Sequence, residues 1–464
     1  MHSPVSHVFP FIKTPSTQTV TLMILDSAHL ELWKKSLSPP LQSWVNAHNF
    51  KAEAGNLLAL PKSDHSIQEW VLGIDASDTL YCLGDLSERL NEGTYSLNDP
   101  FTLLKPDLAL LGFALGSYRF QHFITERKKK SVSLKISPTL FDSLQAMVES
   151  IFWVRDLINF PAESLGPSQL ALEAKELAKA YEAQYKVIVG DQLLEQGYPL
   201  VHTVGRASDD APRMVEITWG NAKHPKVSLV GKGVCFDSGG LDIKSADGML
   251  TMRKDMGGAA HAMGLARLIM HFKLPIQLQL LLPMVENSIN GNAYRPGDIL
   301  MSRKGLSVEI NNTDAEGRLI LADALTRASE TNPELIIDFA TLTGAARIAM
   351  GPTMAALFSN TDSIANSLQK LGETLNDPLW RLPLYQPYKK LNRSKFADLS
   401  NAPSTSYGGA IAAALFLENF VGKDIPWAHF DIMAFNQSAQ PGRPEGGEAM
   451  TLRAVFQYLK DRYA

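Results

Sequence analysis

The stretch Val230–Lys244, VGKGVCFDSGGLDIK, sets charged side chains among glycines and apolar residues of the kind that form a core. It begins at the end of Val227–Val230, an apolar run that predicts a buried strand. A second stretch, Asn311–Arg318 or NNTDAEGR, has the same character, and Asp255 lies between the two at the head of an Ala- and Gly-rich segment. A charge placed where a core should form costs free energy unless something pairs it. The two stretches therefore predict a functional site.

The positive and negative charges of these segments do not cancel. The set is one lysine and four carboxylates: Lys232, Asp237, Asp255, Asp314 and Glu316. Carboxylate oxygens suit hard or borderline divalent ions, and two such ions about 3.5–4 Å apart can clamp one reacting water. Lysine binds a metal only as the neutral amine, a form that burial and a nearby dication both favour. The set predicts a two-metal hydrolase, and for Lys232 alone the alternative is a plain salt bridge to Asp237.

The length and composition fit a cytoplasmic enzyme. At 464 residues the chain exceeds what one hydrophobic core usually serves, so two domains are expected. A net charge of −4 with no basic half argues against nucleic-acid binding. The chain has two cysteines, which fits a reducing compartment. The longest apolar runs, Leu108–Leu115 and Leu280–Val285, are too short to span a bilayer, so no membrane partner is expected.

Strand-like and helix-like segments alternate along the chain, which predicts an α/β fold. We expect a smaller N-terminal α/β domain over 1–125, a linker and connecting helix over 126–160, and a larger catalytic α/β domain over 161–464. The catalytic domain should have a mixed central sheet flanked by helices. The clearest segments are the predicted helices 108–123, 139–157, 255–272 and 319–329 and the predicted strands 19–25, 70–74, 335–340 and 427–432.

The first stretch does not fit the other common motifs that combine glycines with charged residues. A P-loop requires Gly-x-x-x-x-Gly-Lys-Ser/Thr, which is absent, and the dinucleotide fingerprint needs a further glycine three residues after Gly233. Asp237 would also repel a phosphate unless a metal intervened. Histidine is nearly absent from the set, because His261 is predicted to pack within a helix, and this argues against a His-Glu-x-x-His zinc protease.

The second stretch allows two local structures. In an extended segment, Asp314 and Glu316 would point to the same side, and Arg318 would continue that side. Thr313 and Glu316 also fit a capping box before an apolar helix. Capping would explain those two residues and leave Asp314 and Arg318 unexplained.

Several motifs, taken in order, closely resemble the leucyl aminopeptidases, also called cytosol aminopeptidases. The matching pieces are FPAESLGPSQLA at 160–171, VGKGVCFDSGGLDIK, MRKDMGGAAHA at 252–262, NTDAEGRL at 312–319, DFATLTGA at 338–345 and WAHFDI at 427–432. NTDAEGRL matches the family signature without a change. The resemblance covers about 155–464 well and reaches the N-terminal part only near LGFALGSYRF at 111–120.

The resemblance implies two divalent ions, zinc or manganese with magnesium as an option. The tighter ion would be held by Lys232, Asp237, Asp255 and Glu316, with Asp237 and Glu316 bridging. Asp314 would complete the second, more exchangeable site with the two bridging carboxylates. The resemblance also implies a homohexamer.

The resemblance implies catalytic roles for two cations that bind no metal. Lys244 would polarise the substrate carbonyl or stabilise the oxyanion, and Arg318 would hold a bicarbonate ion that acts as general base. A free α-amine would contact Asp255, which selects the ends of unblocked peptides. The residues alone would also allow an endopeptidase or a two-metal phosphoesterase, and some relatives have a regulatory or DNA-binding role.

The same resemblance implies which residues line the pocket for the side chain of the substrate's N-terminal residue. Its expected lining is Met252, Thr341, Leu342, Gly344 and Met433. Methionine is a soft, adaptable wall, consistent with Leu-like, Met-like or broadly apolar residues, although Met252 could also be an ordinary core residue. The chain departs from the family after WAHFDI, where Met433 and the polar Asn436 fall at positions expected to line the pocket. These two residues predict a first pocket that is narrowed or re-tuned relative to the usual one of the family.

Overall fold

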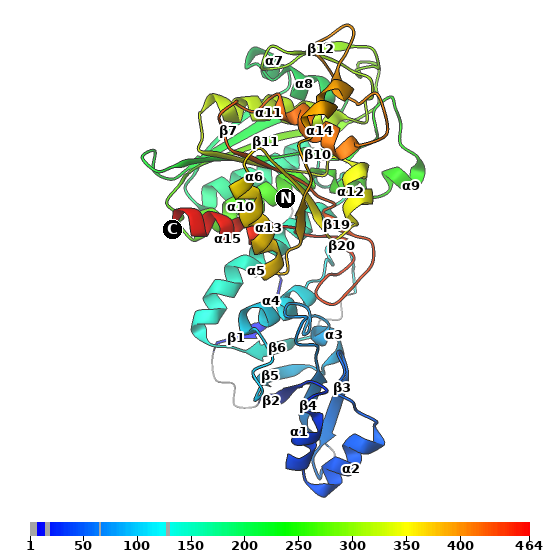
Figure 1. Cartoon of the computed structure of the whole chain (residues 1–464), viewed down its shortest axis with the longest axis vertical. Helices are drawn as coiled ribbons and strands as arrows, with labels where there is room; N and C mark the ends of the chain where they lie inside the picture. Colours follow the sequence, from blue (N-terminus) through cyan, green and yellow to red (C-terminus); the bar gives the residue numbers. More distant parts are fainter. Residues whose placement is uncertain (1–6, 14–18, 65, 127–129) are drawn as a thin grey trace. The chain divides into compact units, whose positions relative to one another are not determined.

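The structure is a computed structural model of the whole chain, and it describes residues 7–13, 19–64, 66–126 and 130–464. The chain forms two compact units (Figure 1). Unit 1 comprises 1–152 and 438–445, and unit 2 comprises 153–437 and 446–464. The boundaries predicted at 125 and 160 stay predictions, and residues 127–129 of the predicted linker lie outside the described residues.

Unit 1 is an α/β unit around one sheet. Among the described residues its strands follow the order β1-β6-β5-β2-β4-β3, parallel throughout except for the antiparallel pair β3–β4. The strands are β1 Phe11–Ile12, β2 Val20–Leu25, β3 Leu57–Pro61, β4 Ile67–Gly73, β5 Gly93–Asn98 and β6 Val132–Lys135. The helices are α1 Leu30–Ser36, α2 Pro39–Ala47, α3 Leu86–Arg89 and α4 Pro106–Gly116, and α5 Pro138–Asn159 then leads the chain into unit 2.

Unit 2 contains a larger, mixed sheet. Its order is β16-β15-β18-β14-β9-β11-β8-β7, with β10 pairing beside β11. The strands are β7 Gln184–Val189, β8 Arg213–Trp219, β9 Lys226–Gly231, β10 Gly233–Asp237, β11 Gln277–Asn287, β14 Leu335–Ala340, β15 Ala355–Ser359, β16 Leu379–Arg381 and β18 Trp427–Asp431. Smaller sheets join β12 Ile299–Met301, β13 Ser307–Glu309 and β17 Leu399–Ser400, and β19 Phe435–Asn436 and β20 Gly446–Gly447.

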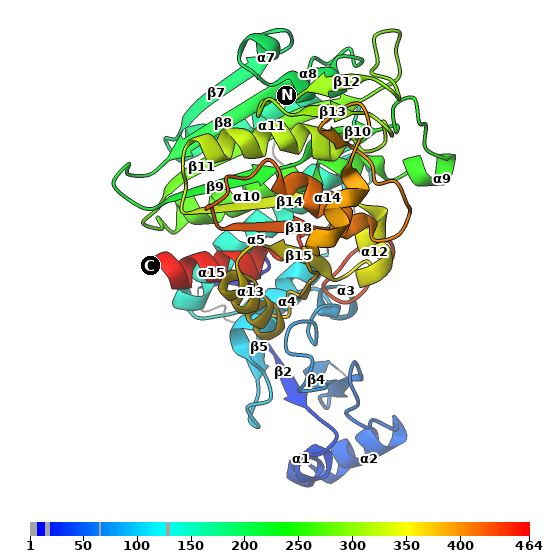
Figure 2. The ribbon, with the colours of Figure 1, turned by 45° about the horizontal axis from the view of Figure 1, so that its top comes forward.

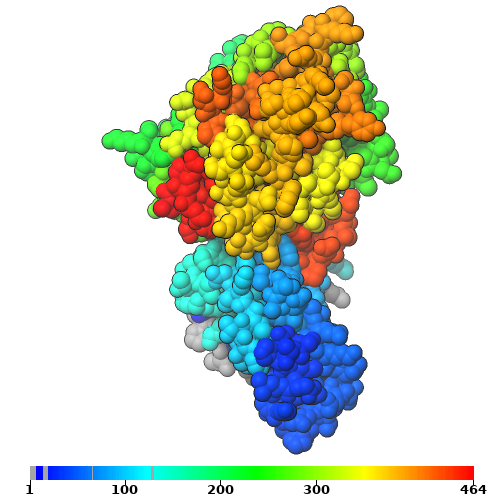
Figure 3. All heavy atoms as spheres, in the orientation of Figure 1, coloured from blue at the N-terminus to red at the C-terminus, as the bar shows by residue number. Residues whose placement is uncertain are grey.

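Helices cover both faces of this sheet (Figure 2). Strand residues alternate between faces, so Val230 joins the core cluster formed with α8 Pro199–Gly205, α11 Glu316–Glu330 and α14 Gly409–Glu418, whereas Gly231 faces α10 Gly257–His271. On the α10 side, α13 Asp362–Thr374 and α15 Leu452–Tyr463 pack together at the surface (Figure 3). The other helical segments are α6 Pro167–Ala180, α7 Gln192–Glu195, α9 Ala246–Met249, α12 Gly344–Met350 and the 3-10 helices η1 Met252–Met256 and η2 Gln386–Asn392.

The predicted elements compare closely with the observed ones, with two corrections. The helix predicted over 108–123 ends at Gly116, where Arg119 Nη1 donates a 2.8 Å hydrogen bond to the Gly116 carbonyl that a continuing helix would have used. The helix predicted over 255–272 is divided into η1 and α10. The fold class, two α/β parts with a mixed sheet in the larger one, is confirmed.

Candidate active site

The predicted charged residues meet where the parallel strands of unit 2 end. Strands β9, β14 and β18 pair in parallel, and β10 pairs in parallel with β11. Lys232 links β9 to β10, and Asp237 is the last residue of β10. In open α/β sheets, ligands bind outside the carboxyl ends of the strands. The strand order therefore brings segments distant in the sequence to one ligand-binding edge.

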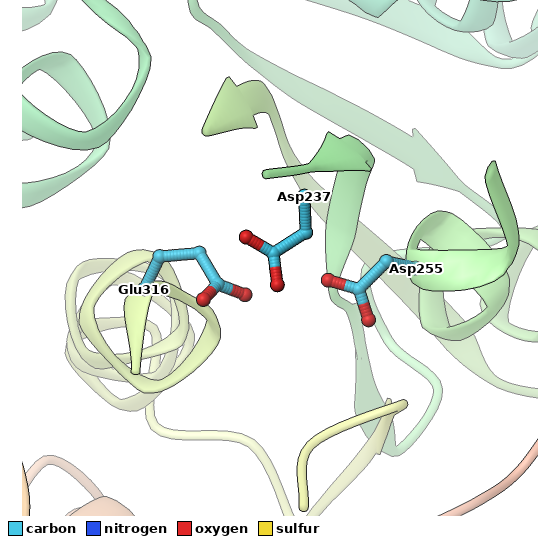
Figure 4. A group of neighbouring side chains, drawn as sticks. All are labelled: Asp237, Asp255 and Glu316. Atoms are coloured by element: carbon cyan, nitrogen blue, oxygen red, sulfur yellow. The ribbon is translucent and has the colours of Figure 1, made fainter. Parts of the chain in front are cut away.

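Three buried carboxylates converge there (Figure 4). Asp237, Asp255 and Glu316 each offer an oxygen, and these atoms all lie within 4.8 Å of one another. Asp237 comes from β10, Asp255 from η1 and Glu316 from the first turn of α11. Asp314 is not part of this group of three, although it lines the same cavity.

Lys232 lies among the carboxylates on the α11 side. Its Nζ is 2.7 Å from Asp255 Oδ2 and 2.9 Å from Glu316 Oε1, and it donates to the Thr341 carbonyl at 3.0 Å. Gly317 leaves room for this lysine, because a Cβ at position 317 would stand 2.5 Å from Lys232 Cε. Burial disfavours the ammonium, but the neighbouring carboxylates outweigh burial and hold the Lys232 pKa above its ordinary value. The alternative of a salt bridge between Lys232 and Asp237 is wrong, because Lys232 pairs with Asp255 and Glu316.

Lys244 occupies the more open side of the cluster. Its Nζ lies 2.8 Å from Asp237 Oδ2 and also contacts Asp314 Oδ1. Asp237 Oδ1 accepts further hydrogen bonds from Asn287 Nδ2 at 2.8 Å and the Gly239 N–H at 2.9 Å. Two lysines thus face four carboxylates, which leaves two negative charges unbalanced within this set.

Burial and the surplus negative charge together raise the pKa of two of these acids. Burial, followed by the neighbouring Asp237, raises the pKa of Glu316 to about 8 and that of Asp314 to about 6. Asp255 differs: burial opposes its charge, yet Lys232 holds its pKa below the ordinary value. Within the described part of the chain, Glu316 Oε2 is buried with no hydrogen-bond partner. An orphaned carboxylate oxygen and an excess of buried acids fit divalent cations.

Neither local structure expected for the second stretch forms. Asp314 lies in a turn and Glu316 begins α11, so the two do not share one side of an extended segment. The capping box is also absent, because Thr313 Oγ1 donates to the Gly239 carbonyl and accepts from the Asp242 N–H. Tertiary partners from the first stretch have replaced the local ones.

Arg318 is buried within α11 beside the cluster. Its Nη1 donates to the Asn401 carbonyl at 2.6 Å, and its Nε has no hydrogen-bond partner among the residues that the structure describes. Burial lowers the Arg318 pKa to about 10, with Glu316 acting in the opposite direction. A buried, unsatisfied guanidinium N–H fits a small anion such as bicarbonate.

A cavity of about 130 Å³ opens above the cluster. All five residues of the predicted metal set line it, together with Lys244. The expected pocket residues line it too: Met252, Thr341, Leu342, Gly344 and Met433. Thr341 Oγ1 also donates to Asp255 Oδ1 at 2.7 Å. Asn436, expected to line the pocket, instead donates to Glu448 Oε2 at 2.7 Å and does not line this cavity.

The cavity has further lining residues that the motifs did not single out. They include Lys254, Arg347, Met354 and Asp431. Asp431 ends β18 and accepts from Thr343 Oγ1 and from the Leu342 and Thr343 N–H groups. Lys254 and Asp431 lie inside quoted motifs and could have been noticed there, whereas Arg347 and Met354 follow the TLTGA motif and carry no local signal.

Two further predictions concern the packing of His261 and the presence of a membrane-spanning helix. His261 is fully buried in α10, with Nδ1 2.6 Å from the Gly257 carbonyl, so the prediction that it packs within a helix is confirmed. Across the described ranges, no helix is both long and apolar enough to cross a membrane.

Comparisons with known proteins bear out the family resemblance, and they correct its extent in the N-terminal part, which reaches well beyond 111–120. The family model described as the cytosol aminopeptidase family, catalytic domain, matches residues 152–456, and the N-terminal domain of M17 aminopeptidases matches residues 20–136. A probable cytosol aminopeptidase of Roseiflexus castenholzii is 40% identical over 368 residues, 75% of each chain. One from Aquifex aeolicus is 38% identical over 361 residues, 75% of this chain and 73% of the relative.

Solved structures show the same relationship. The cytosol aminopeptidase from Coxiella burnetii has a TM-score of 0.94 and 46% identity, with 98% of this chain and 99% of that chain covered. The bottromycin maturation enzyme BotP in complex with Mn has a TM-score of 0.85 and 30% identity, with 96% and 99% covered. The motifs, the two α/β parts and these matches together show that the chain belongs to the cytosol aminopeptidase (M17) family of metallo-aminopeptidases.

Proposed function

We propose that the protein is a two-metal aminopeptidase that removes the N-terminal residue from unblocked peptides. The observation that carries this proposal is the buried group Asp237, Asp255 and Glu316, with Glu316 Oε2 lacking a partner among the described residues, at the end of the sheet. Divalent cations at this group would balance the negative charge that Lys232 and Lys244 leave uncompensated, and they would give the orphaned oxygen a partner.

The family resemblance implies which residues would hold the ions. Lys232, Asp237, Asp255 and Glu316 would hold one ion, and Asp314 would join Asp237 and Glu316 at the second. Divalent ions bound there would supply Lewis acidity toward the scissile carbonyl and activation of a water. Zinc and manganese suit oxygen ligands with one amine, with magnesium as a third option, and the relative BotP was solved with Mn.

Three side chains would take part in the chemistry, and one of them, Asp255, also belongs to the metal set. Asp255 would accept a hydrogen bond from the free α-amine, which confines cleavage to chain ends. Lys244, which is part-buried beside Asp314, would donate to the oxygen on which negative charge develops. Arg318, whose Nε lacks a hydrogen-bond partner among the described residues, would hold bicarbonate, which would supply a general base.

The methionines of the cavity would accept the side chain of the first residue. Met252 and Met433 form adaptable walls that suit Leu-like, Met-like or broadly apolar side chains. Residues Thr341, Leu342 and Gly344 would complete this first pocket.

We also propose a cytoplasmic location and a homohexamer. Light scattering coupled to size-exclusion chromatography tests the assembly.

The decisive experiment compares an unblocked peptide with its N-acetylated form. The protein, loaded in turn with zinc, manganese or magnesium, should release the first residue of Leu-Gly-Gly and leave acetyl-Leu-Gly-Gly intact. Equal cleavage of both peptides would indicate an endopeptidase. Hydrolysis of phosphate esters without peptide cleavage would overturn the proposal in favour of a phosphoesterase.

A further inference from the structure

Two cations line the cavity without a carboxylate of their own among the described residues. Neither Arg347 nor Lys254 forms an ion pair with any carboxylate in the described ranges of the chain. Lys254 is only 4% exposed, so its amine cannot rely on bulk water for solvation. Lys254 is buried next to Asp255, whose charge partly offsets the cost of burying the amine, whereas Arg347 is exposed and its guanidinium is accessible to a ligand from solvent.

Arg347 lines the same cavity as the residues of the expected first pocket. It stands three residues after Gly344 in α12, which places both on one face of the helix. Its Nη2 would be 3.5 Å from a Cβ at Gly344, and its Nη1 lies 3.6 Å from Met433 Sδ. The guanidinium thus lies beside the pocket's small residue and contacts one of its methionine walls.

The carboxylates of the cavity are engaged elsewhere. Asp255 and Glu316 pair with Lys232, and Asp237 and Asp314 pair with Lys244. Asp431 accepts from the Thr343 hydroxyl and two backbone N–H groups. The Arg347 guanidinium donates to a thioether sulfur, which is a weak acceptor. The guanidinium therefore retains donors for a ligand.

We propose that this pocket accepts an acidic N-terminal residue, glutamate or aspartate, in addition to apolar ones. The methionine walls would pack against the methylene groups, and Arg347 would bind the side-chain carboxylate, with Lys254 adding positive charge to the same cavity. Guanidinium binds a carboxylate through parallel N–H···O bonds, which are stronger than neutral hydrogen bonds. This inference rests on the proposed aminopeptidase function and extends its substrate class.

The test uses fluorogenic aminoacyl amides, because a dipeptide has a C-terminal carboxylate that Arg347 could bind instead. The substrates are the glutamyl, glutaminyl and methionyl amides of 7-amino-4-methylcoumarin. For each, kcat/KM is measured with wild type, Arg347→Met and Arg347→Lys, and Lys254→Met tests the second cation. Arg295→Met is the matched control, because the Arg295 side chain is 65% exposed and pairs with Asp298.

In wild type, the glutamyl amide should be cleaved faster than the glutaminyl amide. Arg347→Met should lower the ratio of kcat/KM for glutamyl over methionyl amide by roughly tenfold or more, the usual worth of one charged hydrogen bond. Arg347→Lys should restore part of that ratio, and Arg295→Met should leave it unchanged. Calorimetric binding of free L-glutamate should weaken in Arg347→Met, while L-norleucine binding should not.

Each failure has a separate meaning. An unchanged glutamyl-to-methionyl ratio in folded Arg347→Met, with methionyl amide still cleaved, would overturn the Arg347 assignment and leave the aminopeptidase proposal intact. Failure of the metal-loaded wild type to cleave any of the amides would count against the aminopeptidase proposal itself.

Discussion

Unit 2 holds two buried groups of charged side chains that differ in how their charges balance. At the cavity, Lys232 and Lys244 face four carboxylates, and Glu316 Oε2 has no partner among the described residues. Away from it, Arg155 and Glu448 form a pair with contacts of 3.0 and 3.1 Å from Nη2 to the two carboxylate oxygens. Both Glu448 oxygens are also bound by other donors, from Ala449 and Asn436.

The difference separates a structural pair from a ligand site. A complete set of partners compensates the desolvation of the Arg155–Glu448 pair, so removing one member should harm folding. The cluster at the cavity lacks compensation until a cation arrives, so removing one carboxylate should harm activity and spare the metal-free fold. Substitutions in the two groups should therefore have opposite consequences.

The largest effect should follow Glu316→Gln. Glutamine keeps the shape but removes a negative charge and the best cation ligand, so kcat/KM on an unblocked peptide should fall at least about a thousandfold. Because burial already raises the Glu316 pKa, the metal-free variant should be as stable as wild type in thermal unfolding. Asp314→Ala should act in the same direction. Near-normal turnover with either change would sink the site assignment.

Lys244→Ala should lower kcat by about a hundredfold to a thousandfold, the usual cost of losing one donor to a developing oxyanion. The bound ions should remain, because Lys244 is expected to contact substrate and not metal. Elemental analysis of the purified variant measures this directly. A preparation that has lost both ions would show that Lys244 supports metal binding.

Glu448→Gln should destabilise the protein by about 3 kcal/mol, because Arg155 loses the carboxylate that it pairs with in a buried setting. Denaturant unfolding gives the free energy, and kcat/KM of the remaining folded protein should stay close to wild type. A variant as stable as wild type but inactive would reverse the comparison between the two groups.

His261 extends the comparison to a buried neutral group with complete partners. Its Nδ1 lies 2.6 Å from the Gly257 carbonyl and its Nε2 accepts from the Met450 N–H at 2.8 Å, which requires the neutral ring. Burial lowers its pKa from 6.5 to about 4. Between these values the unfolded chain binds more protons, so His261 should cost about 3 kcal/mol of stability as pH falls from 7 to 4.

The measurement is the free energy of unfolding as a function of pH, compared between wild type and His261→Gln. The variant should be less stable at pH 7 and should lose less stability on acidification. An unchanged slope between pH 6.5 and 4 would show that His261 titrates normally.

The sequence identified the elements of unit 2 and the residue types of its site with few errors. Apolar runs such as Leu335–Ala340 form buried strands because most residues along a strand buried on both faces must be apolar. The charged residues stood out because they interrupt such runs. The end of α4 at Gly116 was missed, because a cap supplied by Arg119 is not encoded in apolar spacing.

The arrangement within the site was less predictable. An extended geometry for Asp314 and Glu316 and a capping role for Thr313 are both reasonable from spacing alone. Thr313 instead binds Gly239 and Asp242, residues from the other stretch, so a tertiary contact overrode the local preference. The position of Asn436 away from the cavity was missed for the same reason, since Glu448 binds its amide.

The amino-acid sequence alone determined that acids outnumber the cations around them and that the motifs belong to one family, because composition and order are properties of the chain itself. Only the tertiary structure decided which groups meet at the site: Lys232 Nζ and the Thr341 carbonyl, 109 residues apart, touch because β9 and β14 pair in parallel register. The tertiary structure also brings Arg347 and Lys254 to the cavity. The spacing of residues along the chain cannot reveal these contacts, because they depend on how distant strands align.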